Sequence, residues 1–308
     1  MPADEYHFYE SPDSGGKLWL RQRWPTVTRQ TFPTIHAVLF ISTVFTTILA
    51  GALQAGVNPL QNPAGIVRGI PFSFTLLFIL LTHELGHYLA ARRHHMEVSL
   101  PYLIPAPSFI GTFGAFIKMR SPVRDKRSLM DIGAAGPLAG VLVAIPVLVV
   151  GLMLSEIRPV LAGPGGAGGI QLGTSLLFEF LTRLTVGTLP SHHDLVLHPV
   201  AFAGWIGLLV TALNLLPVGQ LDGGHVLYAI MGPRSQVISR AVVGILVVLG
   251  IFGWTGWLFW ALLLTILGSR HPFPLDFWTP LDRRRKIIGF ITLAVFVLTF
   301  TPVPFRGI

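Results

Sequence analysis

Long apolar runs separated by short basic segments dominate this 308-residue sequence. Because a transmembrane helix needs ~20 mostly apolar residues, each long run predicts a membrane span. We expect spans at about 36–56, 70–91, 131–154, from 197 to about 216, within 236–269, and at 287–303. The pattern predicts an all-α polytopic membrane protein with about seven transmembrane helices.

Two of these apolar runs do not predict a single unbroken helix. The fourth span meets Pro217 and a group of glycines, so we expect the helix to break there and a short half-helix to continue to Met231. Residues 236–269 fit one overlong helix or two short ones that turn near 253–256. We favour two, because two spans return the basic cluster at 283–286 to the side where the other basic residues lie.

Residues 98–120 follow a different pattern. Two short β-prone runs, 98–104 and 112–119, are punctuated by proline and glycine, which predicts a small membrane-associated β-hairpin. We expect it at the membrane surface near the second span, although an irregular loop fits the same pattern. Residues 175–186 predict an external amphipathic helix.

The predicted organisation has three parts and no separate soluble domain. Residues 1–34 form an N-terminal segment, and residues 35–232 form a membrane core with four spans, the β segment and the amphipathic helix. Residues 233–308 hold the C-terminal spans.

Composition and charge support a membrane location. The chain is 52% hydrophobic and only 12% charged, with a net charge of +8. The topology above puts 18 of the 22 Lys and Arg residues on one side, as the positive-inside rule requires, so the charge predicts orientation and not nucleic-acid binding. We therefore expect an integral protein of the cell (inner) membrane, with the bilayer as a partner and the N-terminus cytoplasmic. The sequence makes no prediction of oligomeric state.

The sequence HELGH puts two imidazoles and a carboxylate inside the second span. Glu84 is the only formal charge between Arg68 and Arg92. An ionisable group within a span is costly and normally marks function. On a helix, His83 and His87 lie one turn apart and can bind one zinc ion, while Glu84 lies beside them to act on water.

Asp222 is the candidate third ligand. It lies twelve residues before Arg234, and His83 lies nine before Arg92, on spans that run in the same direction. The two side chains should therefore lie at similar depth. Two histidines and a carboxylate form a common catalytic site for Zn²⁺, and the absence of cysteine excludes thiolate ligands.

HELGH, together with NLLP at 214–217 and LDGG at 221–224, resembles the site-2 protease family of intramembrane zinc metalloproteases, in its PDZ-free chloroplast and bacterial form. The resemblance covers about residues 70–230. It implies that His83, His87 and Asp222 bind one zinc ion, that Glu84 is the general base and acid, and that Asn214 helps bind the substrate or its oxyanion. It also implies cleavage in or near the transmembrane segment of a single-span membrane protein, as in regulated intramembrane proteolysis.

Several other residues enter the prediction less directly. Gly136 and Gly140, where some relatives carry asparagine, have a spacing that allows close helix packing. Asp125 and Asp131 lie among basic residues, so we expect solvated charges. We expect His94 and His95 to face lipid headgroups, and His225 to lie near the metal as a hydrogen-bonding group.

Two further functions fit parts of the pattern. A transporter or channel could use His83, His87 and Asp222 as an ion site, since transporters also have broken spans and midplane charges. An inactive scaffold could keep the fold alone. The intact HELGH and LDGG motifs favour the protease.

Overall fold

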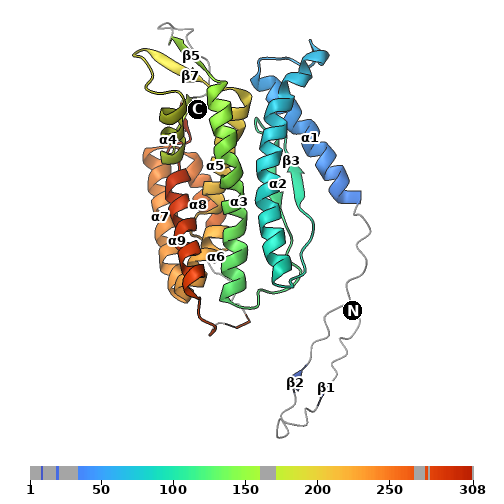
Figure 1. Ribbon diagram of the computed structural model, residues 1–308, viewed down its shortest axis with the longest axis vertical. Helices are drawn as coiled ribbons and strands as arrows, with labels where there is room; N and C mark the ends of the chain where they lie inside the picture. Colours follow the sequence, from blue (N-terminus) through green and yellow to red (C-terminus); the bar gives the residue numbers. More distant parts are fainter. Residues whose placement is uncertain are drawn as a thin grey trace. The chain divides into compact units, whose positions relative to one another are not determined.

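A computed structural model describes residues 8–9, 19–20, 34–159, 171–266, 275–276 and 278–306 (Figure 1). The chain divides into two units, Met1–Ile35 and His36–Ile308. In the first, β1 (Phe8–Tyr9) pairs antiparallel with β2 (Trp19–Leu20). The basic residues of the predicted N-terminal segment and the glycine-rich stretch 163–169 lie outside the described residues.

The second unit is mainly helical. Its helices are α1, which starts just before the unit (Thr34–Gln54), α2 (Ile70–Arg93), α3 (Lys126–Met153), α4 (Leu176–Thr185), α5 (Pro199–Asn214), α6 (Asp222–Met231), α7 (Ser235–Phe252), α8 (Gly256–Ile266) and α9 (Arg283–Thr299), with short 3₁₀ helices at Pro63–Gly69 and Gly232–Arg234. Antiparallel strand pairs join β3 (Tyr102–Pro105) to β4 (Thr112–Phe116), β5 (Glu156–Pro159) to β7 (His193–Val196), and β6 (Gln171–Leu172) to β8 (Phe305–Arg306).

Within the described residues, four helical stretches are long and apolar enough to cross a membrane: Thr34–Gln54, Pro63–Arg93, Lys126–Met153 and Asp222–Phe252. Large apolar side chains on these helices point outward, as lipid contact requires; Phe74, Leu142 and Phe252 are 70%, 74% and 84% exposed. The membrane prediction is thus supported, but the expected count of about seven spans is not confirmed. Helices α5, α8 and α9 have 16, 11 and 17 residues, fewer than the ~20 of a typical span.

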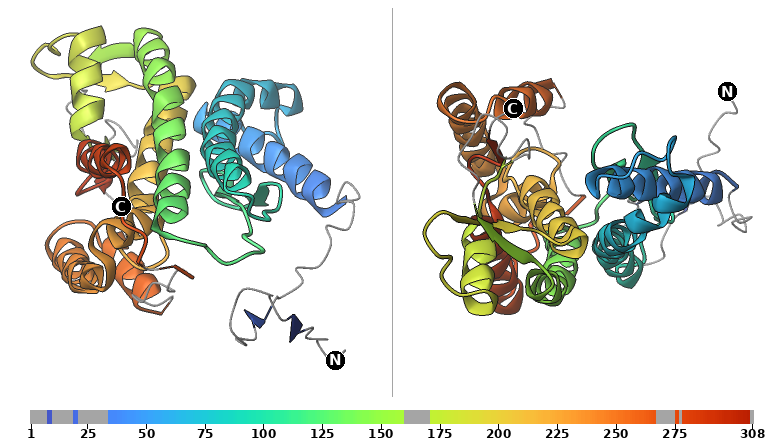
Figure 2. Two further views of the ribbon diagram at one scale, coloured as in Figure 1. Left: turned by 60° about the horizontal axis from the view of Figure 1, so that its bottom comes forward. Right: turned by 90° about the horizontal axis from the view of Figure 1, so that it is seen from above.

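Helix α3 is the centre of the bundle and packs against α2, α5, α6 and α9 (Figures 1 and 2). It starts before the predicted residue 131 because Asp125 caps it: the carboxylate accepts the Ser128 N–H at 2.7 Å, and Ser128 bonds back to the cap backbone. Such a capping box satisfies free amides of the first turn. Asp125, which is partly exposed, thus also caps a helix, a role that the sequence analysis did not assign to it.

The predicted hairpin is present as β3–β4, and a bridge between Val98 and Met119 extends it. It lies along α1, and its place relative to the membrane surface stays a prediction. His36, near the start of this 21-residue helix, lies 3.2 Å from the Leu100 carbonyl, and Gln54, its last residue, donates to the Phe109 carbonyl at 2.5 Å. These polar side chains satisfy carbonyls that would otherwise lie unpaired at the depth of the helices, which is costly in lipid.

The predicted breaks are confirmed. Helix α5 ends at Asn214 and α6 begins at Asp222, and α7 and α8 are separate helices. Between α5 and α6 the backbone folds tightly on itself, since a Cβ at Gly223 would lie 1.9 Å from the Leu215 carbonyl oxygen. Only glycine fits there, and the turn sets Asp222 at the start of α6.

Candidate metal centre and active site

Three predicted ligands converge at one point. His83 and His87 face the same side of α2 and are only 3% and 6% exposed. One Asp222 carboxylate oxygen, Oδ2, lies 3.2 Å from the Nε2 atom of each histidine, and the two Nε2 atoms lie 3.1 Å apart. Side chains remote in sequence thus form a nearly equilateral triangle of donor atoms.

This triangle fits a zinc ion. Ligands at 2.0–2.2 Å in a tetrahedral site lie about 3.3 Å from one another, close to the observed separations. His87 Nδ1 lies 2.8 Å from the Ile132 carbonyl oxygen, to which it can only donate. In the neutral ring, Nε2 then points its lone pair at the Asp222 carboxylate. Two facing lone pairs repel unless a cation lies between them, so the donor set suits a divalent metal.

Glu84 lies beside this centre and is 6% exposed. Its potential ligand atom and those of His83 and His87 fall within 4.8 Å of one another. The carboxylate accepts a hydrogen bond from the backbone N–H of Ile117, just beyond β4. The hairpin therefore holds the acidic side chain of HELGH directly, a contact that the sequence did not indicate.

Asn214, the last residue of α5, lies next to the same centre. Its side-chain nitrogen is 3.3 Å from His83 Nε2. The structure thus brings together all five residues that the sequence singled out. The asparagine is held there because α5 ends at this residue and the chain turns away.

A cavity of about 420 Å³ gives access to these groups. Its polar wall includes His83, Glu84, His87, Asn214 and Asp222, with His225 beside them as expected. The facing wall comes from the hairpin and the segment after it, with apolar residues at 115–117 and 119. The cavity therefore brings the candidate metal ligands and the hairpin to one space.

Two glycines of α3 have a role that the sequence only partly indicated. A Cβ at Gly136 would lie 2.2 Å from His87 Nε2, and one at Gly140 would lie 3.2 Å from His83 Nδ1. The predicted close approach of helices is confirmed at Gly86 of α2, where a Cβ would lie 2.5 Å from the Ala135 carbonyl. The glycines therefore also make room for the imidazoles. Their four-residue spacing, equal to that of the histidines, was the available signal.

A buried His–His–Asp centre within helices of membrane length defines a membrane-embedded metalloprotein. Residues 71–253 match the family described as Peptidase family M50, and the chain belongs to this family. This result confirms the resemblance to site-2 proteases.

Named relatives include two chloroplastic proteins called probable zinc metalloprotease EGY1. The chain is 35% identical to the one from Arabidopsis thaliana over 76% of its own length, and 34% identical to the one from Oryza sativa subsp. japonica over 77%. It is 28% identical over 86% of its length to the probable zinc metalloprotease EGY2 of Oryza sativa subsp. indica, also chloroplastic. The chain spans only 43%, 41% and 49% of these relatives. No solved structure matches it.

Proposed function

We propose that this protein is a zinc metalloendopeptidase that hydrolyses a peptide bond in or near the transmembrane segment of single-span membrane proteins. The main observation behind this proposal is that the Nε2 atoms of His83 and His87 and Asp222 Oδ2 lie within 3.2 Å of one another, beside the buried Glu84. Membership of Peptidase family M50 and the names of the relatives support a zinc-dependent protease.

His83, His87 and Asp222 would hold the metal. A bound zinc ion supplies Lewis-acid polarisation of water and of the substrate carbonyl. The Glu84 carboxylate accepts a proton from the attacking water and passes it to the leaving amine. Asn214 donates its amide hydrogens toward the oxygen that becomes negative during attack.

Two backbone groups orient these side chains. The Ile132 carbonyl accepts the His87 Nδ1–H and so keeps Nε2 directed at the metal position. The Ile117 N–H donates to Glu84 and directs this carboxylate into the cavity. Both contacts restrict groups that must be in position before the substrate reacts.

The hairpin is suited to present the substrate. A helical substrate hides its scissile carbonyl in its own hydrogen bonds, so it must unwind before cleavage. Ser99 N–H donates to the Lys118 carbonyl on one side of the strand, and the neighbouring Ile117 faces the other side, toward Glu84. An unwound peptide can add as a strand along this edge next to Ile117, whose N–H is bonded to Glu84, and so bring its scissile bond next to the metal.

The orientation that we propose follows from the basic helix ends. His94, at the end of α2, contacts Asp131 of α3, which also binds Arg285 of α9, so three predicted cytoplasmic ends meet. This arrangement supports one common side for these three helix ends, and we propose a cytoplasmic N-terminus from the basic residues of the sequence alone. The relatives' names are chloroplastic and do not support the expected cell membrane, so we propose the orientation without assigning the membrane.

Cleavage in liposomes tests this function. The purified chain is reconstituted with a single-span model substrate, and the products are mapped by mass spectrometry. We expect cleavage within or next to the span, loss of cleavage with a chelator and recovery with zinc. Zinc flux without any proteolysis, unchanged in Glu84→Gln, would indicate a transporter. Bound zinc with neither flux nor cleavage would indicate an inactive scaffold.

A further inference from the structure

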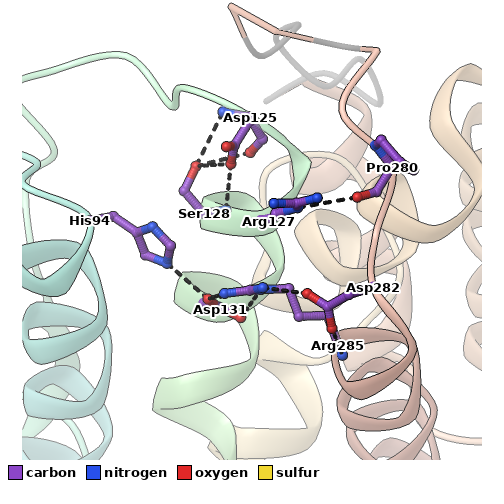
Figure 3. A network of polar contacts seen from close by, with 8 residues as sticks. All are labelled: His94, Asp125, Arg127, Ser128, Asp131, Pro280, Asp282 and Arg285. Carbon is purple, nitrogen blue, oxygen red and sulfur yellow. Dashed lines mark hydrogen bonds and ion pairs between the residues drawn. The ribbon is translucent and has the colours of Figure 1, made fainter.

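A polar network ties the ends of α2, α3 and α9 together (Figure 3). The Asp131 carboxylate of α3 accepts hydrogen bonds from Arg285 Nε at 2.9 Å and from Arg285 Nη2 at 2.7 Å, and lies 2.8 Å from His94 Nε2. Arg285 also pairs with Asp282, the N-cap of α9. The expectations of a solvated Asp131 and a headgroup-facing His94 are therefore wrong, because their partners come from distant parts of the chain.

Asp131 is the neighbour of the residue that orients a candidate metal ligand. The carbonyl of Ile132, a residue that is 4% exposed, accepts the His87 Nδ1–H at 2.8 Å. On α2, His94 follows His87 by seven residues, about two helical turns. The contact between His87 and Ile132 joins α2 to α3. Asp131 belongs to α3 and also contacts α2 through His94, so it is linked to both of these helices.

The bond between Asp131 and Arg285 controls geometry more than stability. Two N–H groups of one guanidinium bind one carboxylate, an arrangement that fixes direction as well as distance. The two side chains are 23% and 27% exposed, so water screens part of their attraction. Arg285 lies outside the residues 71–253 that match the family.

We propose that Asp131 and Arg285 are positioning residues, which hold the start of α3 so that the Ile132 carbonyl aims His87 Nε2 at the metal. Helix α9 is then part of the catalytic unit. The inference rests on the metal-binding role of His87 in the proposed function. The new element is that two residues that do not contact the metal, Asp131 and Arg285, help to set the affinity of the site for zinc.

The test compares Asp131→Asn and Arg285→Gln with Arg183→Gln. Arg183 is a matched control, because it pairs with Glu179 on the surface of α4, 72% exposed and distant in sequence from the site residues. The metal-free proteins, each with all 308 residues, are titrated in detergent with Zn²⁺ in competition with a chelator. Each is also loaded with Co²⁺, whose visible absorption reports the ligand geometry.

We expect both network variants to bind Zn²⁺ roughly 10–100-fold more weakly and to shift the Co²⁺ spectrum, as losses of outer-shell partners do. The control should match the wild type in both measurements. Arg285→Lys, which keeps the charge but loses the two-pronged geometry, should retain the fold and still weaken zinc binding. If Arg285→Gln misfolds, the zinc affinity of Arg285→Lys tests the positioning role instead.

Zinc affinity within twofold of the wild type and an unchanged Co²⁺ spectrum in folded Arg285→Lys and Asp131→Asn would overturn the inference. The network would then only join helix ends. Wild-type protein that binds zinc tightly but cleaves nothing would contradict the proposed protease and leave this inference standing. Wild-type protein that binds no zinc would refute both.

Discussion

Gly136 lies against the imidazole of His87 so closely that a Cβ there would lie 2.2 Å from Nε2. We predict that Gly136→Ala moves this ring, breaks the donor triangle and abolishes both zinc binding and cleavage. Zinc per chain, measured by atomic absorption, and turnover should fall together. Zinc content equal to the wild type would show that the ring can shift without harm.

Gly244→Ala is the matched control for this substitution. Gly244 is also a helical glycine, in α7, but a Cβ there meets nothing within 4 Å. Zinc content and turnover should stay at wild-type levels, and stability should be equal or higher by up to ~1 kcal/mol because alanine favours helices.

Zinc should also stabilise the folded protein. A ligand present at about 1,000 times its dissociation constant stabilises the state that binds it by ~4 kcal/mol. We therefore expect zinc to raise the melting temperature of the chelator-treated wild type. Asp222→Asn, which loses a charged donor, should lose most of this shift. A full shift in that variant would exclude Asp222 as a ligand.

The Ile117 amide gives a test of the hairpin. Ile117→Pro removes the N–H that donates to Glu84 and interrupts the strand, whereas Ile117→Ala keeps the N–H and loses only side-chain atoms. We predict a fall in kcat of ~10-fold or more for the proline variant, below the ~100-fold low end of general-base effects because Glu84 itself remains, and a much smaller fall for alanine. Zinc content should be retained in both, since neither change touches a donor atom. Equal losses of zinc and turnover would mean that the segment only supports folding.

The start of α9 should weaken in acid. The Arg285 backbone N–H, with its side chain, lowers the pKa of Asp282 below the usual 3.8. A lowered pKa in the folded state means that the capping contribution is present above pH 3.8 and is lost as the pH falls through the folded value. Asp282→Asn should flatten the dependence of melting temperature on pH below 4, and an unchanged profile would contradict this role.

Much of the site followed from local sequence patterns. HELGH fixes its own geometry, since residues four apart on a helix share a face. The break before Asp222 was visible in Pro217 and the glycines after it. Both features are determined by residues that lie close together in the sequence, so local patterns predict them.

The remaining features depend on contacts between distant segments. Asp131 looked solvated because its partner Arg285 is 154 residues away. The contact of the hairpin with α1 could not be predicted from the sequence, because the polar side chains of α1 that bind its carbonyls belong to another run. Span counting was limited for a different reason. Helix α8 is apolar but has only 11 residues, fewer than the ~20 of a typical span, so its apolar pattern alone does not define a crossing.

The most direct measurement determines zinc content and cleavage on the same preparations of wild type, Glu84→Gln and Asp222→Ala. We predict one zinc per chain and cleavage for the wild type. We expect retained zinc without cleavage for Glu84→Gln, and loss of both for Asp222→Ala. Full cleavage by Glu84→Gln, or normal zinc and cleavage in Asp222→Ala, would contradict the proposed roles of these residues.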